Sequence, residues 1–110
     1  MNTNNLVQEI KEKVRLLIAE SYKDFKPGLE KDLKTFLETS AEKLERWTVL
    51  YANEGINEEE LEWLLKSQID LISLQALQTA GISKIKLNAF KNNILKLIFE
   101  IIISLVVKRS

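Results

Sequence analysis

Two groups of glutamates are the side chains in this sequence whose types and spacing could do chemistry. Glu38, Glu42 and Glu45 follow one another by four and three residues, so a helix would place them on one side. The run Glu58–Glu60 forms a second group. Carboxylates gathered in this way can bind a divalent cation or transfer a proton.

Structural roles explain both groups more simply. Lys31, Lys34 and Lys43 are close enough to the first group to form ordinary surface ion pairs on a solvated helix face. Asn57 precedes the second group and is a favourable N-cap, and Glu60 stands where its carboxylate can bind the cap amide. Negative charge at a helix N-terminus also interacts favourably with the helix dipole. We therefore predict neither a metal site nor a catalytic role for these carboxylates.

The sequence contains no histidine and no cysteine. Without an imidazole base or a thiol nucleophile, the usual triads of hydrolases cannot form. Zinc sites built on histidine or cysteine, and di-iron sites built on Glu-x-x-His pairs, are excluded for the same reason. No phosphate-binding or calcium-binding loop motif occurs either. We expect a protein that is not an enzyme and that uses no cofactor.

Apolar residues recur every three or four positions along almost the whole chain, which is typical of amphipathic helices. Three breaks divide this pattern. Pro27 disfavours helix at the preceding residue and suits the first turn of a new helix. Gly55 suits the left-handed residue after a helix C-terminus, and Gly81 shortly precedes Ser83, a favourable N-cap. The spacing predicts helices over about residues 5–25, 28–54, 58–80 and 84–108.

These helices predict an all-α fold in a single domain that covers residues 1–110. Short connections force sequential helices to be antiparallel, so we expect an up-down-up-down four-helix bundle. The third break is the weakest, because no proline enforces it. The alternative is a helical hairpin followed by one long helix over residues 58–108, which another chain would have to cover.

Charge is distributed unevenly along the chain, although the net charge is zero. Residues 1–66 carry 14 acidic and 10 basic side chains, whereas residues 67–110 carry 2 and 6. The lysines of residues 84–96 do not share one helix face, so nucleic-acid binding is only a minor alternative. The first residues contain no basic segment followed by an apolar run, and we therefore expect a cytoplasmic protein without a secretory signal.

The last two predicted helices carry more apolar surface than one buried stripe requires. Three large side chains of the helix over residues 58–80 project from the side opposite its main stripe. In the last helix, eleven of the fourteen residues 94–107 are apolar, and three of them border its narrow polar stripe. The predicted interaction surface consists of these six residues: Trp63, Leu74, Leu77, Phe99, Ile103 and Val107.

Three interpretations of this surplus differ in what covers it. The last two helices could occupy the interior of the bundle more fully than the others, or the surplus could be buried by self-association. Exposed apolar patches commonly mark protein contacts, and two-fold dimers are the commonest assemblies. In the third interpretation the last helix contacts a membrane, although its apolar stretch of about 21 Å is shorter than the roughly 30 Å bilayer core. We predict a non-enzymatic interaction or scaffold protein that binds itself, first as a dimer, or another helical protein; a membrane-associated helper is the main alternative.

Overall fold

The computed structural model describes residues 3–21, 26–72 and 74–109 of the chain. Every regular element within these residues is a helix, which confirms the predicted all-α fold. The predicted part of the first helix over residues 22–25 lies outside the described residues. The described residues form five helices: α1 (Thr3–Ser21), α2 (Lys26–Ala52), α3 (Glu58–Ile69), α4 (Gln75–Thr79) and α5 (Lys84–Arg109).

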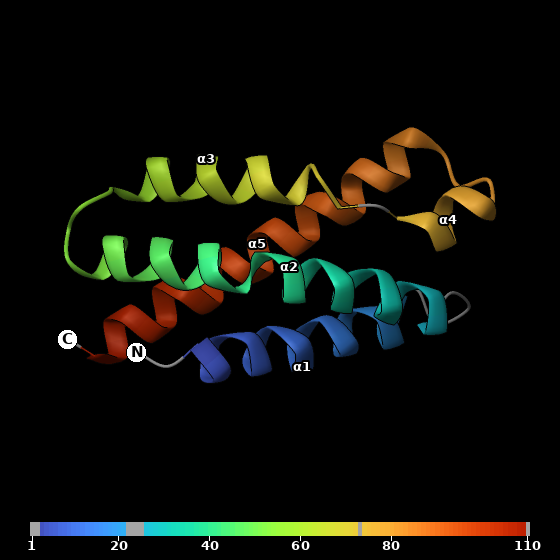
Figure 1. Ribbon diagram of the computed structural model, residues 1–110. Coiled ribbons are helices and arrows are strands. Elements are labelled where there is room, and N and C mark those ends of the chain that lie inside the picture. The colour runs from blue at the N-terminus through green and yellow to red at the C-terminus, as the bar shows by residue number, and fades with distance from the viewer. Residues whose placement is uncertain (1–2, 22–25, 73, 110) are drawn as a thin grey trace.

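The four long helices run alternately in opposite directions, and α4 is a single short helix between α3 and α5 (Figure 1). The bundle is elongated, 43 Å long and 22 Å across. α1 packs against α2 and α5, and α3 packs against the same two helices, so α1 and α3 occupy opposite corners. The start of α1 and the end of α5 lie at one end of the bundle, and α4 lies at the other end, beside the start of α5 (Figure 1).

The core is built from the predicted apolar stripes. On the long helices most buried side chains follow one another by three or four residues, with adjacent buried pairs such as Phe36 and Leu37, which keeps them on the inner face. α5 contacts α1, α2 and α3, and its buried residues therefore need more than one stripe. The fully buried side chains include Leu6, Ile10, Ile18, Leu29, Leu44, Leu61, Leu65, Ile69, Phe90 and Ile94.

Polar side chains within this core have hydrogen-bond partners. Gln68 of α3 donates from Nε2 to Ser40 Oγ of α2 at 2.9 Å, which fixes the two helices relative to each other. Thr48 donates from Oγ1 to the Leu44 carbonyl oxygen at 2.7 Å. A buried polar group without a partner would cost roughly 1–3 kcal/mol, so these bonds remove a penalty.

The connection from α2 to α3 differs from the prediction by one residue. The left-handed residue is Glu54, with φ of 62°, and not Gly55. Gly55 instead donates its backbone N–H to the Leu50 carbonyl oxygen at 2.7 Å, which closes the end of α2. A Cβ at Gly55 would lie 3.2 Å from Leu50 Cδ2 and 3.3 Å from Leu50 O. Glycine is therefore suited to this position because the backbone approaches Leu50 closely.

The start of α3 has the predicted capping box. Asn57 Oδ1 accepts a hydrogen bond from the Glu60 backbone N–H at 2.8 Å. Glu60 Oε1 accepts one from the Asn57 backbone N–H at 3.0 Å. Glu60 thus has the structural role that the sequence predicts.

The prediction of one continuous helix over residues 58–80 is wrong, because α3 ends at Ile69 and α4 begins at Gln75. Short turn bonds follow α3, including Ile72 N to Ile69 O at 3.0 Å. Lys91 of α5 then donates from Nζ to the Asp70 carbonyl oxygen at 3.2 Å, which satisfies part of the open helix end.

Burial explains this break. In one continuous helix Leu74 and Leu77 would point away from the side that Leu61 and Leu65 bury. The interruption before α4 lets both pairs face the core, where all four side chains are buried. The apolar area gained therefore outweighs the helical hydrogen bonds lost between α3 and α4.

The turn predicted at residues 81–83 is confirmed, so the alternative of one long helix over residues 58–108 is wrong. Gly81 has φ of 77°, a left-handed conformation that glycine adopts at little cost. Ser83 Oγ accepts a hydrogen bond from the Lys86 backbone N–H at 3.3 Å and caps the start of α5.

Candidate functional site

Leu74 and Leu77 do not belong to an exposed surface, because each is only 1% exposed. Both side chains are part of the core where α4 packs against α2. Their predicted place on the interaction surface is therefore wrong. The error has a physical cause, because the prediction assumed a continuous helix through residues 70–74. The helix is interrupted there, since α3 ends at Ile69 and α4 begins at Gln75.

The three predicted residues of α5 are divided between core and surface. Phe99 and Ile103 are half-buried and pack against the core cluster. Val107 is 65% exposed. The polar stripe beside them is exposed as predicted, at Lys96, Glu100 and Ser104. Most of the surplus apolar surface of α5 is thus buried within the bundle, and its outer edge remains accessible.

Trp63 is the largest exposed apolar side chain of α3, with 67% of its surface accessible. Val106 of α5 lines one groove together with residues at the start of α3. Lys91 of α5 contacts Asp70 at the end of α3. These two contacts show that α3 and α5 are antiparallel and that Trp63 is roughly level with Phe99 and Ile103. We call Trp63, Phe99, Ile103 and Val107 the α3–α5 surface.

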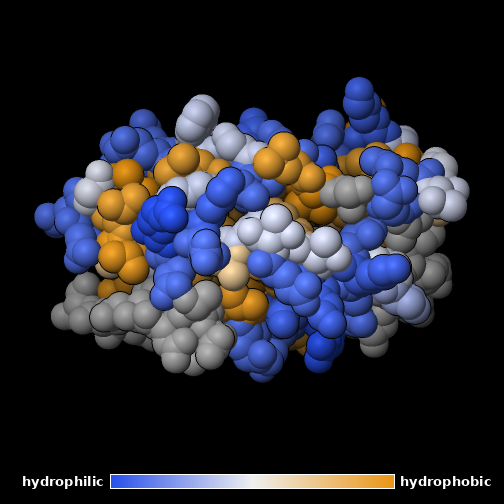
Figure 2. Space-filling view, in the orientation of Figure 1, coloured by the Kyte–Doolittle hydropathy of each residue, from blue (hydrophilic) through white to orange (hydrophobic). Residues whose placement is uncertain are grey.

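Hydrophobic side chains on the face in Figure 2 occur as several separate patches between hydrophilic ones. Some of these patches lie over α3, and one lies between α1 and α2 (Figures 1 and 2). An arrangement of small patches with charged surroundings is typical of contacts made by a few anchor residues, in contrast to the broad apolar interface of an obligate dimer.

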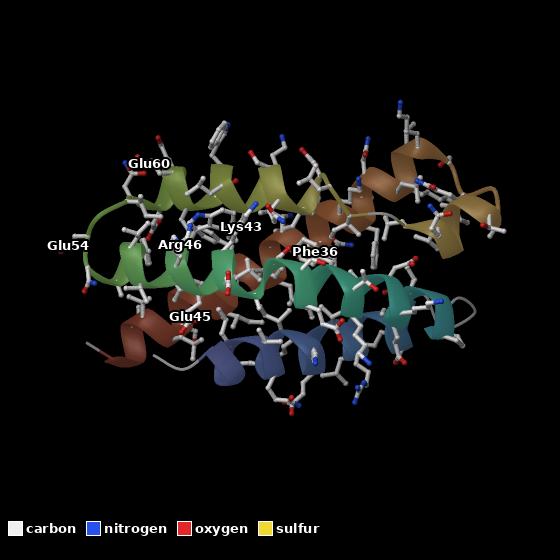
Figure 3. All side chains as sticks on the ribbon, viewed as in Figure 1. Phe36, Lys43, Glu45, Arg46, Glu54 and Glu60 are labelled. Atoms are coloured by element: carbon white, nitrogen blue, oxygen red, sulfur yellow. The ribbon has the colours of Figure 1, made fainter. Side chains whose placement is uncertain are left out.

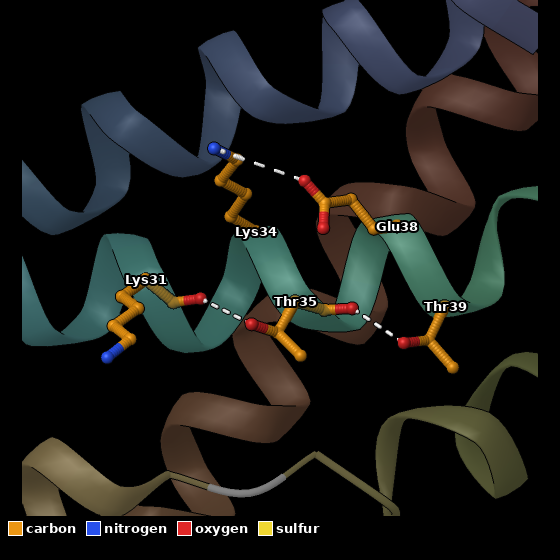
Figure 4. A network of polar contacts seen from close by, with 5 residues as sticks. All are labelled: Lys31, Lys34, Thr35, Glu38 and Thr39. Carbon is orange, nitrogen blue, oxygen red and sulfur yellow. Dashed lines mark hydrogen bonds and ion pairs between the residues drawn. The ribbon is translucent and has the colours of Figure 1, made fainter.

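A groove of about 520 Å³ runs between α1 and α2, and the sequence reasoning did not find it. Its floor is apolar and its rim is basic. Arg15 Nε lies 3.9 Å from Glu30 Oε1, and Lys34 Nζ lies 4.0 Å from Glu38 Oε1 on the side of α2 that faces α1 (Figure 4). We call this feature the α1–α2 groove; it is lined by Lys11, Val14, Arg15, Ile18, Pro27, Glu30, Lys31, Leu33, Lys34 and Leu37.

The carboxylates that could have formed a chemical site do not converge. Glu45 of the first group lies on α2 and Glu60 of the second group lies on α3, and the two side chains are apart (Figure 3). Within the described ranges no group of three acidic side chains could hold a metal ion. Glu58 accepts a hydrogen bond from the Tyr51 hydroxyl at 3.1 Å. Partial burial, this bond and the negative charge of Glu58 raise the pKa of Tyr51 above its ordinary value of 10.0.

Comparison with protein-family models, curated proteins and solved structures finds no match to this chain. The site therefore has to be interpreted from its own residues. None of the helices in the part of the chain that the structure describes combines the length and apolar content needed to cross a membrane.

Proposed function

We propose that the protein is a non-enzymatic, cytoplasmic interaction module that associates with a second copy of itself through the α3–α5 surface. The observation that carries this proposal is the exposure of Trp63 on the outer side of α3. Tryptophan is among the residues most enriched at the energetic centres of protein interfaces. Binding a partner that covers this side chain is favourable, because it removes the apolar surface of the indole from water.

Apolar residues of the adjacent helix α5 support the same proposal. Half-buried Phe99 and Ile103 lie at about the same level of α5, and exposed Val107 extends the apolar edge by one turn. An exposed aromatic side chain on one helix and half-buried apolar residues on the adjacent helix resemble the composition of interface centres. Association would complete the burial of these side chains without any change in the bundle.

Replacing Trp63 with alanine is expected to weaken self-association by about 30-fold or more, which corresponds to roughly 2 kcal/mol. The free energy of unfolding of the single chain should change by less than about 1 kcal/mol, because the side chain is exposed and alanine favours helix. Sedimentation equilibrium over a range of concentrations measures the association constant, and urea unfolding measures stability.

Leu16→Ala provides a matched control, since Leu16 is a comparably exposed apolar residue of α1 at 57% exposure. This variant should associate as the parent chain does. A second readout uses a Trp47→Phe chain, in which Trp63 is the only tryptophan. Its emission should shift to longer wavelength on dilution, as the indole returns to water. An unchanged association constant in Trp63→Ala would overturn the proposal.

A further inference from the structure

We propose that the α1–α2 groove receives the Trp63 side of α3 from a second copy of the chain. This inference rests on the proposed self-association and identifies the surface that Trp63 meets. The Trp63 side of α3 is called the donor surface, and the α1–α2 groove that receives it is called the receptor surface. Two features of the groove, its apolar floor and its positive rim, carry the inference.

The floor of the groove is apolar, so an indole above it would also pack against the aliphatic stems of the rim lysines. Val14 and Ile18 of α1 and Leu33 and Leu37 of α2 line it, and all four belong to the buried core. The groove volume of about 520 Å³ lies within the range of clefts that bind large side chains and small ligands. Arg15 on the rim can also stack on an aromatic face.

The rim of the groove carries a net positive charge. Its lining contains four cationic side chains, Lys11, Arg15, Lys31 and Lys34, against the single carboxylate of Glu30. Glu38, which lies 4.0 Å from Lys34, adds a second carboxylate at the edge of the groove, so two positive charges remain in excess. The two ion pairs are long, at 3.9 and 4.0 Å, and join exposed side chains, so each is weak. The groove therefore favours an apolar group that is accompanied by negative charge.

The outer side of α3 has this combination. Glu59 and Glu62 precede Trp63 by four residues and one residue, and both are exposed. Exposed Lys66 follows Trp63 by three residues, so the three charges leave one negative charge in excess. Other acidic residues at the start of α3 already have structural partners: Glu60 caps the helix, and Glu58 accepts the Tyr51 hydroxyl. Glu59 and Glu62 are thus placed to meet the basic rim when the indole enters the groove.

The other described grooves lack a net positive rim. The groove between α1 and α5, of about 630 Å³, carries Glu9 and Glu100 together with Lys13 and Lys96, so its charges balance. A groove of about 600 Å³ beside the α2–α3 connection is lined by carboxylates and would repel the acidic side of α3. Charge complementarity therefore selects the α1–α2 groove.

The two surfaces belong to different corners of the bundle. α1 and α3 lie diagonally across from each other, with α2 and α5 between them. One chain cannot bring its own Trp63 to its own groove, and the contact has to join two copies. Such a donor-to-receptor contact leaves one free donor and one free receptor on each pair, so further copies can add as a ring or an open chain.

The test mixes two chains that each lack one surface. The donor-deficient chain is Trp63→Ala, and the receptor-deficient chain is Lys11→Glu/Lys31→Glu, which reverses charge at two rim positions. Each chain alone should remain monomeric at concentrations where the parent chain assembles. An equal mixture should form a complex of two chains and no larger species, because only one contact is intact. Light scattering measures the masses, and circular dichroism checks that both variants retain the helix content of the parent.

The matched control is Lys13→Glu/Lys43→Glu, which makes the same change of charge on the same two helices outside the groove. It should assemble as the parent does. Parental assembly by the Lys11→Glu/Lys31→Glu chain, or a mixture that stays monomeric, would overturn the groove assignment. In that case a monomeric Trp63→Ala chain would still support self-association by another contact of Trp63. Parental assembly by Trp63→Ala would overturn both proposals.

Discussion

Replacing Phe90 with alanine is expected to lower the free energy of unfolding by about 3–5 kcal/mol. Phe90 is 0% exposed and lies on α5, the helix that contacts α1, α2 and α3. The truncation removes the transfer energy of the ring and leaves a cavity that surrounding helices can only partly close. A loss of this size is a large part of the 5–15 kcal/mol that stabilises an ordinary domain.

Urea unfolding followed by circular dichroism measures this change, and Ile85→Ala is the matched control. Ile85 lies on the first turns of the same helix but is 83% exposed, so its truncation should change stability by less than about 0.5 kcal/mol. Equal effects of the two substitutions would mean that the first part of α5 is not packed against the other helices.

Replacing Leu77 with alanine is expected to lower the free energy of unfolding by about 2–5 kcal/mol. The side chain is 1% exposed and fills the contact of α4 with the rest of the core. Its loss should act on stability and leave the association constant of the folded chain within about threefold of the parent, because buried residues make no contact with a partner. Trp63→Ala is expected to behave in the opposite way.

Gln78→Ala is the control for this experiment, since Gln78 is an exposed neighbour on the same short helix. Urea unfolding and sedimentation equilibrium are measured on both chains. A Leu77→Ala chain with parental stability and weakened association would contradict the structure and restore the surface that the sequence pattern predicts.

Most of the fold follows from local rules that the sequence displays directly. The capping box at Asn57 and Glu60 and the cap at Ser83 use side chains that bind nearby backbone groups, so their spacing alone identifies them. The apolar stripes give the inner face of each long helix for a similar reason, because helical periodicity decides which residues share a side. Such signals need no knowledge of the partner helix.

No glycine or proline in the sequence marks the break between α3 and α4. Its cause is tertiary, since Leu74 and Leu77 face the core together with Leu61 and Leu65 only when the helix is interrupted. The available signal was the presence of two apolar faces on one predicted helix. That pattern fits an exposed interface and a broken helix equally well, and packing against α2 decides between them.

The α1–α2 groove could not be predicted from one stretch of sequence. Its rim combines Lys11 and Arg15 with Lys31 and Lys34, and these pairs come together only when two helices pack side by side. Each pair taken alone is an ordinary solvated helix face. Trp63, in contrast, was found from the sequence because it lies opposite the apolar stripe of its own helix, and its exposure confirms that position.

The mass of the unmodified chain in solution tests the central proposal most directly. Light scattering on a size-exclusion column, without detergent and over about a hundredfold range of concentration, reports the assembled state. Self-association predicts a mass above that of one 12.7 kDa chain that rises with concentration. A mass of 12.7 kDa at every concentration would contradict it.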